Sequence, residues 1–136
     1  PRTEREGDRI RDGEVKDLAA FEDGTAVVST VDGRVHVVPI SGPPRALEGA
    51  AHQPVLAVHD GSRRVFAGDR AGRLLVWDLG AAGSQPVTSV VVRRLGEGEV
   101  NREAGVLRVA ITPDGRVAVT GDERGVVAFT AFEGGE

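Results

Sequence analysis

Leu74-Leu75-Val76-Trp77-Asp78-Leu79 is an apolar run that contains the only tryptophan of the chain. It follows the segment Gly68-Asp69-Arg70-Ala71-Gly72-Arg73, in which two glycines bound a polar turn. A short apolar run between turn residues predicts a buried strand. Weaker copies of the same arrangement surround Gly33 and Gly125, so the chain contains an internal repeat.

The repeat has three units with the same order of features. In each unit a first strand ends at a tight turn, which is Asp114-Gly115 in the third unit. Asp-Gly is typical of hairpin turns. A second strand, a turn at Gly33, Gly72 or Gly125, and a third strand follow. The spacing of the first two of these glycines is typical of repeats of about 40 residues.

Fourth strands are predicted for two of the three units. Segment 45–47 follows the first unit and segment 87–92 follows the second, whereas the third unit ends near Phe132. Residues 8–11 precede the first unit, at the place expected for a lone outer strand. The predicted division is an outer or closing strand within 1–13, a first unit at 14–48, a second at 49–92, an exposed loop insertion at 93–103 and a third unit at 104–136.

The composition favours strands over helices. Hydrophobic residues make up 40% of the 136 residues, which is typical of a soluble globular protein. Nineteen glycines are spread along the chain, so many tight turns are expected. Apolar residues do not follow a long helical period, and Gly or Pro interrupts every longer window. We therefore predict an all-β chain built from four-stranded antiparallel sheets.

Charge and cysteine content exclude several classes of function. The net charge is −4, with acids and bases interspersed, so neither a nucleic-acid partner nor a membrane partner is expected. No apolar run approaches the about 20 residues that a membrane helix needs. The absence of cysteine suits a reducing compartment, and we expect a cytoplasmic protein. Because the first residue is Pro1 and not Met, we expect a segment of a longer chain.

Residues with the spacing of known catalytic or metal sites do not occur. His36, His52 and His59 have no neighbouring ligands at metal-binding spacing. No serine lies in a Gly-x-Ser-x-Gly segment, and the Gly-rich segment 79–84 lacks the Lys of a phosphate-binding loop. The sequence therefore predicts no catalytic residue, no cofactor and no metal, and a protein that is not an enzyme.

The repeat resembles the WD40-repeat β-propeller family. Trp77-Asp78 after three apolar positions resembles the ending of a WD40 unit, and Thr112-Pro113-Asp114-Gly115 resembles the Ser-Pro-Asp-Gly turn of the family. The resemblance covers residues 14–132 and implies three blades, either a partial propeller or half of an oligomeric one. The residues that carry the repeat signature are Trp77, Asp78, Gly33, Gly72, Gly125, Asp114 and Gly115.

The units depart from the family in one respect. In WD40 blades a His, a Ser or Thr, an Asp before the turn glycine and the Trp form a hydrogen-bonded group. The middle unit keeps Trp77 but has Ala67 and Ala71 at the Ser and Asp positions. We therefore expect the sheets to pack through apolar side chains in place of a buried polar network. Trp77 is expected to pack between blades.

The resemblance implies a non-catalytic scaffold that binds protein or peptide partners. The candidate partner-binding residues are Arg70 and Arg73, around the middle turn, and Arg93 and Arg94, at the start of the loop insertion. An acidic peptide or a phosphate group is the kind of partner that these arginines would favour. The simpler interpretation is that they are solvated turn residues.

Three blades do not close a ring, because propellers have about four to eight. Further blades, or a second copy of the chain, are therefore expected partners. Two alternatives remain open. One is the sensor or regulatory propeller of a larger bacterial-type multidomain protein whose catalytic part lies elsewhere. The other is a propeller that binds a small molecule in its channel, for which Asp17, Gln53 and Arg108 are the candidate residues.

Overall fold

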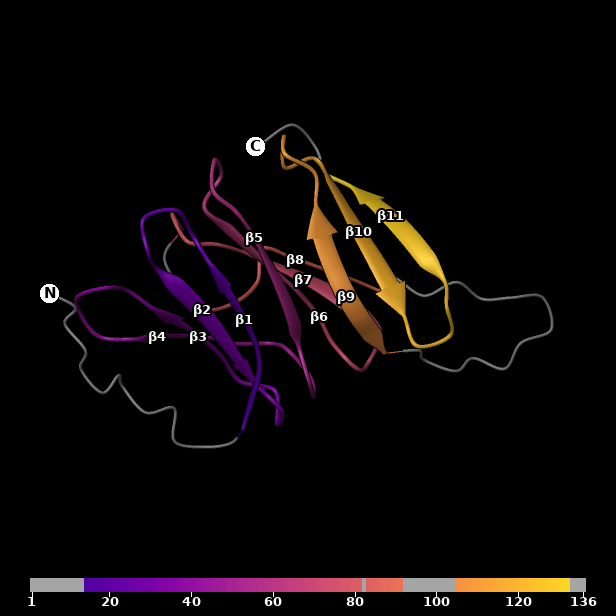
Figure 1. Ribbon diagram of the computed structural model, residues 1–136, viewed down its shortest axis with the longest axis horizontal. Coiled ribbons are helices and arrows are strands. Elements are labelled where there is room, and N and C mark those ends of the chain that lie inside the picture. Colours follow the sequence, from indigo (N-terminus) through magenta and orange to yellow (C-terminus); the bar gives the residue numbers. More distant parts are fainter. Residues whose placement is uncertain (1–13, 82, 92–104, 133–136) are drawn as a thin grey trace, which may run out of the picture.

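The computed structural model of the chain describes residues 14–81, 83–91 and 105–132. These residues form strands and no helix, which confirms the prediction of an all-β chain (Figure 1). Accordingly, the described residues contain no helix that is long and apolar enough to cross a membrane. The predicted outer strand at 8–11 and the loop insertion at 93–103 lie outside the described residues.

The strands form three antiparallel sheets, each made from consecutive strands. Sheet I contains β1 (Val15–Ala20), β2 (Ala26–Thr30), β3 (Val35–Val38) and β4 (Arg45–Leu47). Sheet II contains β5 (Val55–His59), β6 (Arg64–Gly68), β7 (Arg73–Asp78) and β8 (Thr88–Val91). Sheet III contains β9 (Val106–Ile111), β10 (Val117–Asp122) and β11 (Val127–Ala131). The predicted fourth strands of the first two units are therefore present as β4 and β8.

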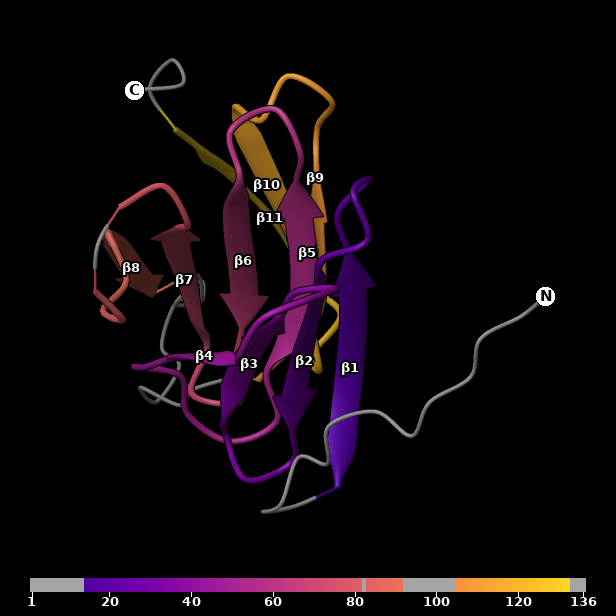
Figure 2. The ribbon, with the colours of Figure 1, turned by 90° about the vertical axis from the view of Figure 1, so that its left-hand side faces the viewer.

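The three sheets are stacked in chain order, with sheet II between the other two (Figure 1). Each sheet begins with its first strand at one edge and ends with its last strand at the opposite edge. The first strands β1, β5 and β9 are neighbours along one side of the molecule (Figure 2). The chain therefore crosses each sheet from the edge where the first strands meet to the opposite edge, and then returns to begin the next.

Sheet II is buried on both faces. Side chains alternate across a strand, so β7 sends Leu75 and Trp77 toward sheet I, and Leu74 and Val76 toward sheet III. All four are almost completely buried. This is why Leu74 to Trp77 is a continuous apolar run and not an alternating one.

Two hydrophobic clusters correspond to the two joints between sheets. The cluster between sheets I and II contains Phe21, Val27, Val35, Val37, Leu47, Leu56, Val65, Ala67, Leu75 and Trp77. The cluster between sheets II and III contains Phe66, Leu74, Val76 and Ala118, with Ala57, Val109, Ile111 and Phe132 at its margin. The first cluster is the larger, and its largest side chain is that of Trp77.

Trp77 joins sheets I and II through both packing and a hydrogen bond. Its side chain is 1% exposed, and its indole Nε1 donates a hydrogen bond to the carbonyl oxygen of Glu48 at 3.0 Å. Glu48 directly follows β4, the outermost strand of sheet I. The tryptophan therefore connects the third strand of one sheet to the end of the sheet before it.

Replacement of Trp77 is expected to destabilise the chain more than any substitution of an exposed apolar residue. We expect Trp77→Ala to lower the free energy of unfolding by about 3–5 kcal/mol, because a large buried side chain leaves a cavity. Trp77→Phe should cost less, about 1–3 kcal/mol, because it keeps most of the apolar volume but leaves the Glu48 carbonyl without its donor. Urea denaturation followed by far-ultraviolet circular dichroism measures both.

Ile40→Ala is the control for the tryptophan series. Ile40 is 65% exposed, so its truncation should change the free energy of unfolding by no more than about 0.5 kcal/mol. If Trp77→Ala and Ile40→Ala lowered the free energy of unfolding by the same amount, the joint between sheets I and II would not be a main source of stability.

Candidate functional site

The turn at Gly33, Gly72 and Gly125 has the same geometry in all three sheets. Each glycine has a positive φ, between 82° and 104°, which is costly for residues with a Cβ. Each glycine N–H donates to the carbonyl oxygen of the residue three positions earlier, namely Thr30, Asp69 or Asp122, at 3.0–3.1 Å. The three units thus share one turn, between the second and third strands of each sheet.

The carboxylate of Asp69 is the most buried charged group among the described residues. Its Oδ1 accepts hydrogen bonds from the backbone N–H groups of Ala71 and Arg73, which closes the turn. Its Oδ2 accepts one from the N–H of Ala51, in the segment that links sheets I and II, at 2.9 Å. Asp69 therefore fixes the middle turn to the chain that leads into its own sheet.

Arg73 completes this network. Its guanidinium forms an ion pair with Asp69, with Nη2 and Oδ2 at 3.0 Å, and Nη2 also donates to the carbonyl oxygen of Gly49 at 2.8 Å. A buried carboxylate is stable only when it is paired and hydrogen-bonded, and all of these requirements are met here. The sequence-based expectation of purely apolar packing is therefore wrong for the middle sheet.

The sequence did contain a signal for this network. In WD40 units the acidic residue lies directly before the turn glycine, and this chain has Ala71 at that position. The acidic residue of the middle turn is instead Asp69, three residues before Gly72. Asp122 occupies the same position relative to Gly125. Asp122 Oδ1 accepts hydrogen bonds from the N–H groups of Arg124 and Val126. Polar residues three positions before each turn glycine were the recognisable pattern.

The turns at the other end of the sheets are held by exposed aspartates. The hydrogen bond from the Arg116 N–H, followed by that from the Thr112 hydroxyl, lowers the pKa of Asp114 below its usual value of 3.8. The pKa of Asp23 is lowered mainly by hydrogen bonds from Thr25. Because these pKa values are lower in the folded state, the ionised carboxylates favour folding at neutral pH. That contribution is lost as the pH falls through the folded-state pKa values.

Two of the four predicted partner-binding arginines lie in the described residues, and both already have protein partners. Arg73 is held by Asp69, as described above. Arg70 forms an ion pair at 3.2 Å with Glu123, in the turn between β10 and β11, and donates to the side-chain oxygen of Gln53 at 3.3 Å. Arg93 and Arg94 lie outside the described residues. The structure therefore places Arg70 and Arg73 at the joints between sheets.

A shallow hollow crosses the three first strands, and we call it the inner-strand hollow. It is lined by Lys16 and Asp17 of β1, Val55 of β5, and Leu107 and Arg108 of β9. It brings together Asp17 and Arg108, two of the three residues expected to face a channel. The third, Gln53, does not line it.

Of the three charged groups in the inner-strand hollow, the carboxylate has hydrogen-bond partners and the two cations have no ion-pair partner in the described part of the chain. The Asp17 carboxylate accepts hydrogen bonds from the N–H groups of Leu18 and Leu56, both at 2.8 Å, and so links β1 to β5. Lys16 and Arg108 are exposed, and neither forms an ion pair within the described part of the chain. The hollow therefore offers two available cations beside the apolar side chains of Val55 and Leu107.

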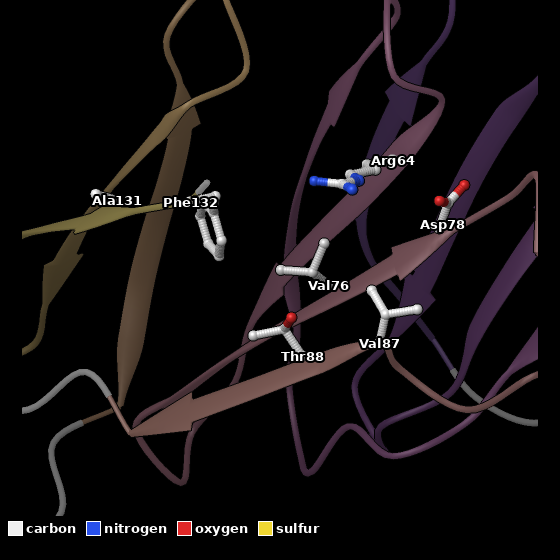
Figure 3. Close-up of a pocket in the computed structure, with 7 residues that line it drawn as sticks. All are labelled: Arg64, Val76, Asp78, Val87, Thr88, Ala131 and Phe132. Carbon is white, nitrogen blue, oxygen red and sulfur yellow. The ribbon is translucent and has the colours of Figure 1, made fainter. Parts of the chain in front are cut away.

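A second hollow lies between the outer half of sheet II and the end of β11, and Figure 3 shows the residues around it. Phe132 stands on one side, its ring in edge-to-face contact with Phe66 at 5.7 Å between centroids. On the other side are Arg64, Val76, Asp78 and Thr88 of sheet II, together with Val87, which directly precedes β8. Asp78 Oδ1 also accepts a hydrogen bond from the Gly80 N–H, so its carboxylate closes the turn after β7.

The histidines and acids do not gather into a metal site in the part of the chain that the structure describes. His59 contributes to the joint between sheets II and III, because its Nε2 lies 2.8 Å from the carbonyl oxygen of Pro113 and its Nδ1 lies 2.8 Å from the Ser62 hydroxyl. Its imidazole is therefore occupied by structural contacts.

Comparisons of the sequence with protein families and with curated proteins found no match. The arguments about function therefore rest on the geometry described above.

We expect Asp69→Ala to cost about 3 kcal/mol of folding stability, because it leaves Arg73 and three backbone N–H groups without their acceptor. This loss of stability is at the lower end of the range for removing one partner of a buried ion pair, because the Arg73 side chain is 34% exposed. The equivalent Asp122→Ala should cost only about 1 kcal/mol, because Asp122 holds its own turn alone. Chemical denaturation of both variants measures the difference, and equal costs would show that the Arg73 ion pair and the link to Ala51 contribute nothing to stability.

Proposed function

We propose that this chain is a WD40-like propeller segment that acts as a non-catalytic scaffold for protein or peptide partners. Three features support the propeller architecture: the sheets are antiparallel, each runs from an inner to an outer strand in chain order, and the first strands are neighbours. These features are typical of propeller blades around a central axis. The repeated turns at Gly33, Gly72 and Gly125 support a common origin for the three units.

The observation that carries the binding function is the inner-strand hollow. Its lining comes from all three sheets, so it exists only when the sheets are stacked. Lys16 and Arg108 supply two exposed positive charges, while Leu107 supplies an exposed apolar surface beside them. Surfaces of this kind favour a partner that presents carboxylates next to an apolar side chain, such as an acidic peptide segment.

The net charge of the chain confines this preference for acidic partners to the inner-strand hollow. The net charge is −4, so an acidic partner is repelled by the surface as a whole and is attracted only where cations are concentrated. Binding at the hollow should therefore weaken as ionic strength rises, because salt screens exposed charges. This salt dependence separates a charge-driven contact from purely apolar adsorption.

Reversal of both cations in the hollow tests the proposal. We expect Lys16→Glu/Arg108→Glu to bind a fluorescein-labelled peptide of alternating Glu and Leu about five- to tenfold more weakly than the unaltered chain, since each exposed charge pair contributes up to about 1 kcal/mol. Fluorescence anisotropy at low and moderate salt measures the dissociation constant.

Arg116→Glu/Arg124→Glu is the matched control for charge. Both arginines are exposed turn residues, and neither lines the hollow. Because two cations are again replaced by two acids, this variant has the same net charge as the first. Equal weakening in the two double variants would show only a non-specific charge effect. No binding of the acidic peptide by the unaltered chain, with a lysine-rich peptide of the same length as reference, would contradict the proposal.

A further inference from the structure

The two end sheets each leave one face without a neighbouring sheet in the described part of the chain. Sheet II meets sheet I on one side and sheet III on the other. We call the face of a sheet that points toward the next sheet in chain order its leading face, and the opposite one its trailing face. The faces without a neighbour are then the trailing face of sheet I and the leading face of sheet III (Figure 1).

Both of these faces carry apolar side chains. The cross-strand row Leu18, Val28, His36 and Ala46 lies on the trailing face of sheet I. The row Ala110, Val119 and Phe129 lies on the leading face of sheet III, with Val127 beside it. Leu18 is 62% exposed, Val127 60% and Phe129 72%. Antiparallel sheets that face water normally place polar residues on that face, so these faces are suited to being covered.

The two faces are of opposite kind, and the chain itself shows how such faces combine. Sheet I presents its leading face to the trailing face of sheet II, and sheet II presents its leading face to the trailing face of sheet III. Both joints include a backbone hydrogen bond from the start of one sheet to the turn of the sheet before it. These bonds run from Gln53 N–H to the Val31 carbonyl at 2.9 Å, and from Val106 N–H to the Asp69 carbonyl at 3.0 Å.

We propose that a second copy of this chain covers both faces, so that sheet III of each copy packs on sheet I of the other. The proposal extends a joint that the chain already forms twice, and it therefore requires no new mode of packing. It rests on the propeller architecture proposed above. Propellers have about four to eight blades, and six is the only multiple of three in that range, so two copies close the ring.

The mass of the chain in solution tests this proposal directly. We expect light scattering after size exclusion to give twice the chain mass of 14.2 kDa, independent of concentration from about 10 to 200 µM. A folded chain of single mass throughout that range would overturn the proposal. A mass that rises continuously with concentration would also overturn it, because an open head-to-tail assembly does not close.

Two substitutions on opposite faces test the pairing. Leu18→Asp on sheet I and Phe129→Asp on sheet III should each raise the dimer dissociation constant by about 100-fold or more, because each places an unpaired carboxylate inside the contact. Both residues are exposed within one copy, so both variants should keep the circular dichroism spectrum and the Trp77 fluorescence of the folded chain. Loss of the dimer in Phe129→Asp alone would overturn the head-to-tail pairing in favour of a contact between two copies of sheet III.

Val87→Asp is the control, since Val87 is a comparably exposed apolar residue that precedes the outer strand β8 and lies on neither face. It should remain a dimer, and its dissociation would contradict the assignment of the contact to the two end sheets. Failure of the dimer is distinguishable from failure of the proposed function. A monomer that still binds the acidic peptide overturns only the dimer, whereas a dimer that does not bind it overturns only the scaffold proposal.

Discussion

The contact on which the rest of the structure depends is the set of hydrogen bonds around the Asp69 carboxylate. It fastens the β6–β7 turn to Ala51, in the segment through which the chain passes from sheet I to sheet II. The Asp69 carbonyl then receives the Val106 N–H, where sheet III begins. One residue therefore fixes the entry into its own sheet and into the next, and so helps to position the first strands β5 and β9.

Close approach of the sheets at this point also explains the glycine at position 68. A Cβ on Gly68 would lie 2.3 Å from Cγ1 of Val106, so only glycine lets β9 pack against the end of β6. On the other face of sheet II, the Trp77 side chain fills the joint with sheet I, and its indole N–H donates a hydrogen bond to the Glu48 carbonyl oxygen. Apolar packing and the buried ion pair thus act at opposite ends of the same strand, β7.

The strands and their grouping into antiparallel sheets were largely predictable because their determinants are local. Apolar runs bounded by turn glycines specify the strands, and the repeat specifies how many sheets they form. The fourth strands β4 and β8 could be placed for the same reason. The Asp69 network could not be derived in this way, because its partners Ala51 and Gly49 meet the turn only after sheet I has packed on sheet II. A carboxylate in a turn looks like a solvated one until the three-dimensional neighbours are known.

The candidate site shows the same division between local and non-local information. Asp17 and Arg108 were recognisable as residues of first strands, but their meeting depends on the lateral alignment of β1, β5 and β9. Conversely, the sequence suggested Arg70 and Arg73 as partner-binding cations. In the structure each of them forms an ion pair with a carboxylate of the chain itself. Arginines beside a turn are thus poor guides to a binding surface in a stacked repeat, because the neighbouring sheet supplies their partners.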